Sequence, residues 1–303
     1  GQLQSLLLSL GLVQRLVKCL AIVGKGASER VVILLSRLVM MPGGMFALQY
    51  VEGGGLQPQL IQSLLAPSNR PGMQSDSLII LSILARASRD FYPPLHASGL
   101  YPQLAALLGD SKGEAMVRAR VCNLVGNLCR HSDYFYDFLL QHGVLSLVVR
   151  CASDPDPATR KFACFAIGNA AFHSASLYEA LRQGVPSLVT CLAEPIEKTR
   201  SNAAGAIGNL VRNSGLLMDT LLSSGAVTAL IEAAQPPTGP DSSSRVALYS
   251  LGTVAAYDQC KHVLQQSAFL EGLEAMAEGG GGDKTTAKYA ARVMDRLKAP
   301  GRK

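Results

Sequence analysis

The stretch Arg160-Lys-Phe-Ala-Cys-Phe-Ala-Ile-Gly-Asn-Ala-Ala-Phe-His173 decides the fold of this chain, because versions of it recur along the sequence. In each version an arginine precedes a Gly-Asn pair by eight residues, and the pairs are Arg118 and Gly126, Arg160 and Gly168, and Arg200 and Gly208. A helix formed from this stretch is apolar almost all round, so neighbours must cover it on several sides. We expect those neighbours to be its own copies.

A second marker, a glycine or near equivalent before an apolar helix, recurs every 41 to 44 residues. It places repeat starts near residues 11, 55, 99, 143, 184, 225 and 267. Repeats of roughly 40 to 47 residues are typical of armadillo and HEAT proteins. The sequence therefore predicts one all-α, right-handed superhelical solenoid over residues 1–303, with six full repeats and a partial seventh. We expect these glycines to end the preceding helix in the left-handed conformation. The start at Gly1 indicates a fragment of a longer chain.

Composition narrows the class of protein. Hydrophobic residues make up 48% of the 303 residues, which is enough for a continuous core, but no apolar run reaches the roughly 20 residues of a membrane helix. The seven cysteines are odd in number and form no Cys-x-x-Cys pair. They favour core thiols in a reducing compartment, the cytosol or nucleus, over a zinc site. We expect no membrane partner and no metal.

No catalytic constellation is visible. Kinase signatures are absent, and the five histidines form no His-Glu-x-x-His pair. His131 and His173 occupy matching repeat positions, which favours a structural role. The segment itself is predicted not to be an enzyme and to hold no cofactor.

Three long runs, residues 125–136, 154–171 and 202–213, resemble the C-terminal armadillo region of Fused-type serine/threonine kinases. The resemblance implies that a kinase domain lies elsewhere in a parent chain. It also implies roles in Hedgehog signalling and in microtubule-based structures such as the ciliary central apparatus. The implied partners are kinesin-like proteins, ciliary or microtubule-associated proteins, and components of the Hedgehog pathway. The implied locations are the cytoplasm and the cilium or axoneme, with the nucleus as an alternative.

Two functions from different classes remain open. The first is a non-catalytic interaction scaffold, in which the long helices line a peptide-binding groove. Its predicted site comprises Asn123, Asn127, Asn169, Asn209, Arg130 and Arg212. An Asn side chain offers both a donor and an acceptor to a peptide amide, although it could equally tie adjacent repeats together. Importin-like proteins carry a tryptophan four residues before this Asn, whereas here Asn123, Phe165 and Gly205 stand there. The second function is an intramolecular regulator of the parent kinase domain.

The net charge of +6 is concentrated near the end of the sequence. Residues 283–303 hold seven basic and two acidic residues, a net charge of +5. The predicted basic stripe comprises Lys284, Lys288, Arg292 and Arg296. The predicted apolar face, suited to packing on the sixth repeat, comprises Ala287, Ala291, Met294 and Leu297. The stripe is either a solvated capping face or a contact for an acidic partner such as a tubulin tail. Nucleic acid is not expected, because one helix supplies few phosphate contacts.

Overall fold

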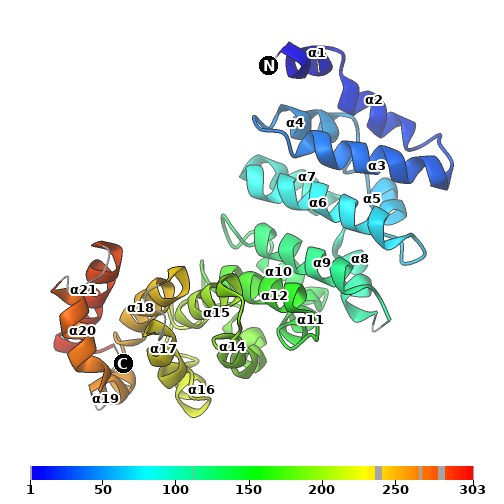
Figure 1. The fold of residues 1–303 in the computed structure, drawn as a ribbon. Coiled ribbons are helices and arrows are strands. Elements are labelled where there is room, and N and C mark those ends of the chain that lie inside the picture. Colours follow the sequence, from blue (N-terminus) through cyan, green and yellow to red (C-terminus); the bar gives the residue numbers. More distant parts are fainter. Residues whose placement is uncertain (1, 111, 236–240, 266–267, 279–283, 303) are drawn as a thin grey trace. The chain divides into compact units, whose positions relative to one another are not determined.

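The computed structural model describes residues 2–110, 112–235, 241–265, 268–278 and 284–302 (Figure 1). In these ranges all regular structure is helical, apart from an isolated bridge between Tyr257 and Arg302. This confirms the predicted all-α class. No helix in the described ranges is both long enough and apolar enough to cross a membrane.

Helices follow a short, short, long order seven times over the described residues. The first three triplets are α1 (Gln2–Ser9), α2 (Leu12–Cys19) and α3 (Lys25–Val39); α4 (Met45–Glu52), α5 (Pro58–Leu64) and α6 (Pro71–Ala87); and α7 (Tyr92–Ala97), α8 (Tyr101–Gly109) and α9 (Ala115–Leu128). The next two are α10 (Tyr136–Gln141), α11 (Val144–Cys151) and α12 (Pro157–Ala170); and α13 (Tyr178–Leu181), α14 (Val185–Cys191) and α15 (Glu197–Asn209). The last two are α16 (Met218–Ser223), α17 (Ala226–Ala234) and α18 (Ser242–Val254); and α19 (Asp258–Gln265), α20 (Phe269–Ala277) and α21 (Lys284–Lys298).

The chain forms two compact units, Gly1–Leu147 and Val148–Lys303, divided within α11. In the first unit α6 packs against α3 and α9. In the second, α15 packs against α12 and α18, and α18 packs against α21 (Figure 1). Within each unit the long helices therefore cover one another, as the repeated sequence predicts.

Glycines at the repeat markers lie between the first and second helix of a triplet. Gly11, Gly99, Gly143 and Gly225 have positive φ angles of 59°, 63°, 67° and 72°, so the expected left-handed conformation is confirmed there. It is wrong at Gly184, whose φ is −78°, because a 3₁₀ turn (Arg182–Gly184) runs straight into α14. It is also wrong at residue 55, where the preceding glycine, Gly54, has the positive φ of 89° instead. The predicted start near residue 267 lies outside the described residues, and the repeat count stays a prediction.

The predicted core around α12 is partly correct. Ala163, Ala166 and Ile167 are buried, but Phe162 and Phe165 are only half-buried. Small residues pack against the neighbouring long helix, and the larger rings are left at its edge. A further buried set, absent from the prediction, is the tyrosine carried by α4, α7, α10 and α13. These residues are Tyr50, Tyr92, Tyr136 and Tyr178.

The repeated arginine has a structural task in the second unit. Arg160 donates from Nη1 to the Asp154 carbonyl (2.8 Å) and from Nε to Glu194 (2.6 Å). One repeat later, Arg200 donates from Nη1 to the Glu194 carbonyl (2.9 Å) and from Nη2 to Asp241 (2.6 Å). Each arginine thus closes the loop before its own helix and pairs with a carboxylate of the following loop. The arginine that stands eight residues before each Gly-Asn pair of this unit therefore recurs because it links its own repeat to the next one.

Asp241 caps α18 and makes this link sensitive to acid. Burial alone would raise the pKa of Asp241, but hydrogen bonds from Ser243, from the Ser244 N–H and from Arg200 outweigh it and lower the pKa to about 2. A carboxyl group with a lowered folded-state pKa stabilises the fold above its unfolded pKa, near 4, and loses that contribution as the pH falls toward 2. We expect Asp241→Asn to cost about 1 to 2 kcal/mol at pH 7. Urea unfolding at several pH values should show this difference shrinking between about pH 4 and pH 2; a difference independent of pH would contradict the assignment.

Ile167 and Ile207 are fully buried in α12 and α15. We expect Ile167→Ala and Ile207→Ala each to lower the free energy of unfolding by about 2 to 5 kcal/mol, because each leaves a cavity between stacked helices. Ile22, whose side chain is 82% exposed, is the matched control, and Ile22→Ala should change stability by less than about 0.5 kcal/mol. Urea midpoints that fall equally in all three variants would argue against this packing.

Candidate functional site

Asparagines of α15 bind the backbone of the long helix one repeat earlier. Each donates from Nδ2 to a main-chain carbonyl 41 residues before it: Asn202 to Lys161 (3.0 Å), Asn209 to Gly168 (2.9 Å) and Asn213, just beyond the helix, to Phe172 (3.0 Å). Asn169 itself lies half-buried on α12. The side-chain Nδ2 atoms of these three asparagines thus tie adjacent repeats together. This is the alternative role that the sequence left open for the repeated Asn.

The first unit uses its asparagines in the same way. Asn123 and Asn127 of α9 both donate to the Ser82 hydroxyl of α6, at 3.1 and 2.8 Å. Asn127 is only 5% exposed, so it is poorly placed to meet a peptide. Arg130 lies on the surface near the end of this helix.

Asn209 keeps hydrogen-bonding groups for other contacts. It is half-buried, and it makes no second side-chain hydrogen bond within the described residues. Its Oδ1 is therefore an acceptor that a bound peptide N–H could use. Nδ2 also carries a second N–H, so an acceptor and a donor both stay available for the predicted role at this position.

Aromatic rings and cations lie beside these asparagines. Phe172 is 37% exposed, and the Arg212 guanidinium lies over its ring, 4.2 Å from the centroid. Lys161 lies over the half-buried Phe162 in the same manner, at 4.4 Å. We call Phe162, Phe165, Asn169, Phe172, Asn209 and Arg212 the long-helix face of the second unit. Flat rings flanked by fixed cations suit contact with a protein segment.

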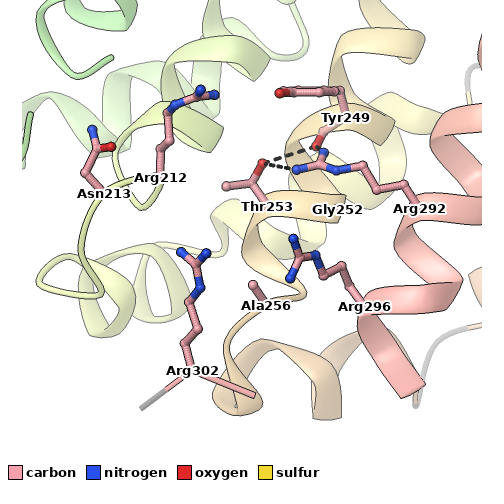
Figure 2. A pocket seen from close by; sticks show the side chains of 9 residues that line it. All are labelled: Arg212, Asn213, Tyr249, Gly252, Thr253, Ala256, Arg292, Arg296 and Arg302. Atoms are coloured by element: carbon pink, nitrogen blue, oxygen red, sulfur yellow. Dashed lines mark hydrogen bonds between the residues drawn. The ribbon is translucent and has the colours of Figure 1, made fainter. Parts of the chain in front are cut away.

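A pocket of about 350 Å³ adjoins this face (Figure 2). Its lining combines Arg212 with Tyr249 and Thr253 of α18, Arg292 and Arg296 of α21, and Arg302. No carboxylate is among its lining residues. Tyr249, Thr253 and Arg302 were not predicted as site residues. Gly252-Thr253 stands at the repeat position of Gly208-Asn209 and could have pointed to Thr253, and the basic segment 283–303 includes Arg302.

The four residues of the predicted basic stripe are not equally exposed. Lys284, Lys288 and Arg296 are exposed, but Arg292 is half-buried against α18. Its guanidinium lies 4.3 Å from the centroid of the Tyr249 ring, and burial lowers its pKa.

The predicted apolar face of α21 is wrong by one position. The buried residues are Thr286, Ala290 and Val293, whereas the predicted Ala287, Ala291, Met294 and Leu297 are half-buried. The helix is rotated so that Arg292, together with small and β-branched side chains, meets α18. α21 still packs against the sixth triplet, as expected.

The cysteines and His131 make contacts that serve the fold. All seven cysteines are free thiols, and every one except the half-buried Cys19 is buried. The His131 ring lies 2.9 Å from the Arg86 carbonyl through Nε2. The described residues contain no group of His, Cys, Asp and Glu side chains that could hold a metal ion.

Substitution at Asn209 tests its link to α12. We expect Asn209→Ala to lower the free energy of unfolding by about 1 kcal/mol, because the Gly168 carbonyl loses its donor. Asn209→Asp should cost more at pH 7, because an ionised carboxylate then faces that carbonyl. Stability should partly recover below about pH 4, where the introduced carboxyl is protonated and donates again. Equal stability of both variants at pH 7 and pH 3 would contradict the bond.

Comparisons with known proteins agree with this architecture. Residues 180–212 match the model of the armadillo/β-catenin-like repeat. A designed armadillo repeat protein in complex with the peptide (KR)4 superposes with a TM-score of 0.70 over 79% of this chain and 98% of its own, at 21% identity. An engineered protein of known crystal structure superposes with a TM-score of 0.84 over 95% of this chain and 69% of its own, at 18% identity.

Curated relatives are serine/threonine kinases. Mouse serine/threonine-protein kinase 36 is 35% identical over 169 residues, covering 51% of this chain and 12% of that protein. Serine/threonine-protein kinase TIO of Arabidopsis thaliana is 34% identical over 128 residues, covering 42% of this chain and 9% of that protein. The chain spans about a tenth of the length of these relatives. It is an all-α armadillo-type solenoid, and its resemblance to the Fused-type serine/threonine kinases is confirmed over about half of its residues.

Proposed function

We propose that the chain is a non-catalytic protein-interaction scaffold, and that it binds an extended segment of a partner along the long-helix face. The observation that carries the proposal is the alignment of half-exposed rings with the Asn209 acceptor and the Arg212 cation. Rings bury area at low entropic cost, and the acceptor can fix the direction of a peptide backbone. Asn169 is included by its repeat position. Asn123 and Arg130 belong to the first unit and are proposed as a separate contact, from which the buried Asn127 is left out.

The positive charge on and beside the long-helix face indicates the charge of the partner segment. The designed armadillo protein of similar fold is in complex with a basic peptide, (KR)4. Here Arg212 lies on the face, and Arg292 and Arg296 line the adjoining pocket. A basic peptide would be repelled at this position, so we expect an acidic segment. Lys284 and Lys288 extend the same positive charge along α21.

Similarity to serine/threonine-protein kinase 36 suggests the setting. We propose that the chain acts as part of a Fused-type kinase in Hedgehog signalling and in ciliary or other microtubule-based assemblies. Kinesin-like or ciliary proteins would be the partners, in the cytoplasm or axoneme. Regulation of the parent kinase domain is the alternative, and it predicts that adding this chain to that domain changes its activity or its choice of substrate.

Site-specific photo-crosslinking tests the face. A photoreactive phenylalanine analogue in place of Phe172 should crosslink to a partner in cells. The same analogue in place of Leu216, which is 53% exposed between α15 and α16, should not. Crosslinks at both positions, or at Leu216 alone, would place the partner elsewhere. The crosslinked protein can then be identified by mass spectrometry, which also tests the proposed kinesin-like or ciliary partners.

A further inference from the structure

The pocket beside the long-helix face gathers four arginines from three segments of the second unit. Arg212 follows α15, Arg292 and Arg296 lie on α21, and Arg302 follows that helix. Figure 2 shows their side chains reaching toward a common space beside α18. The Arg302 backbone N–H donates to the Ala256 carbonyl (2.6 Å), which holds this segment against the end of α18.

Arg292 is held in place before any ligand arrives. It donates from Nη1 to the Tyr249 carbonyl and from Nη2 to the Thr253 hydroxyl (3.2 Å), and it stacks on the Tyr249 ring. Gly252 permits this approach, since a Cβ there would lie 2.9 Å from Nη1. Burial lowers the pKa of Arg292, and the nearby charges of Arg296 and Arg212 lower it further.

These four charges are not neutralised within the described residues. Arg160 and Arg200 of the same unit each pair with a carboxylate at 2.6 Å. By contrast, none of the pocket arginines forms an ion pair with a described residue, and Arg212, Arg296 and Arg302 make no side-chain hydrogen bond there. Like charges gathered around one concave space raise the local potential and favour an anion.

We propose that this pocket binds a phosphate monoester, carried as a phosphorylated side chain of the protein segment that lies on the long-helix face. Guanidinium forks match phosphate oxygens, and the phosphate carries close to two negative charges at pH 7. A volume of about 350 Å³ accommodates one such side chain. Asn213 lines the pocket and follows Asn209 and Arg212 closely, so a segment on the face can extend into it. This step rests on the proposed scaffold function.

Binding measurements with the 303-residue chain test the pocket. The probes are inorganic phosphate and three degenerate peptide libraries that carry phosphoserine, serine or glutamate at one fixed position. We expect the phosphoserine library to bind at least about tenfold more tightly than the other two. Arg296→Gln and Arg302→Gln should each reduce this preference for the phosphoserine library about tenfold. Lys284→Gln and Lys288→Gln remove the same charge from exposed positions outside the pocket lining, and each should change it less than about twofold.

The outcomes separate the pocket from the face. Equal losses in the arginine and lysine variants would overturn the site, because the binding would then be general electrostatic attraction. Equal binding of the phosphoserine and serine libraries would overturn the phosphate assignment, and the Phe172 crosslink would still report on the face. Inorganic phosphate binding without a preference for phosphopeptides would overturn the assignment to a protein segment. Unchanged melting temperatures of Arg296→Gln and Arg302→Gln, whose side chains are exposed, verify folding.

Discussion

Hydrogen bonds from amide side chains to the backbone of the preceding long helix are the constraint on which the second unit depends. The last four carbonyls of a helix have no partner within it, and Gly168 belongs to the last turn of α12. Asn209 supplies the missing donor from the next repeat. Asn213 does the same for the Phe172 carbonyl beyond the helix end. Because the end of α12 is completed by residues of the next repeat, these two repeats stabilise one another, and their spacing of 41 residues is fixed by hydrogen bonding as well as by apolar packing.

That constraint also shapes what the face can recognise. The fold uses one N–H of the Asn209 amide, so this side chain can still accept from a peptide N–H through its oxygen and donate its second N–H to a peptide carbonyl. The guanidinium of Arg212 adds further donors to this face. A bound segment would therefore donate backbone N–H groups to the amide oxygen, pack against the aromatic rings of the face, and place anionic groups beside the arginine.

Periodicity made the fold predictable. The Arg-to-Gly-Asn spacing locates α9, α12 and α15, because each element of the spacing has a repeated structural task. The candidate site was less accessible, since the same pattern cannot say whether an Asn serves the fold or a ligand; at Asn127, burial decides for the fold. The rotation of α21 was missed for a related reason. Its pattern of small and basic residues allows two faces, and only the contact of Arg292 with Tyr249 selects between them.

Replacement of Asn by Thr at one repeat position explains how a basic pocket can form without breaking the repeat. Gly208-Asn209 of α15 corresponds to Gly252-Thr253 of α18. The Thr253 hydroxyl donates within its own helix, to the Tyr249 carbonyl at 3.4 Å, and it accepts from Arg292. The link of α18 to α15 is kept by another side chain, because the Ser250 hydroxyl donates to the Ala204 carbonyl at 2.8 Å. The link of α21 to α18 is made by Arg292. Arg292 places a positive charge at this link, whereas the link of α15 to α12 uses the neutral amide of Asn209. The contact between α18 and α21 thereby supplies one wall of the proposed anion site, with Gly252 and Thr253 in its lining.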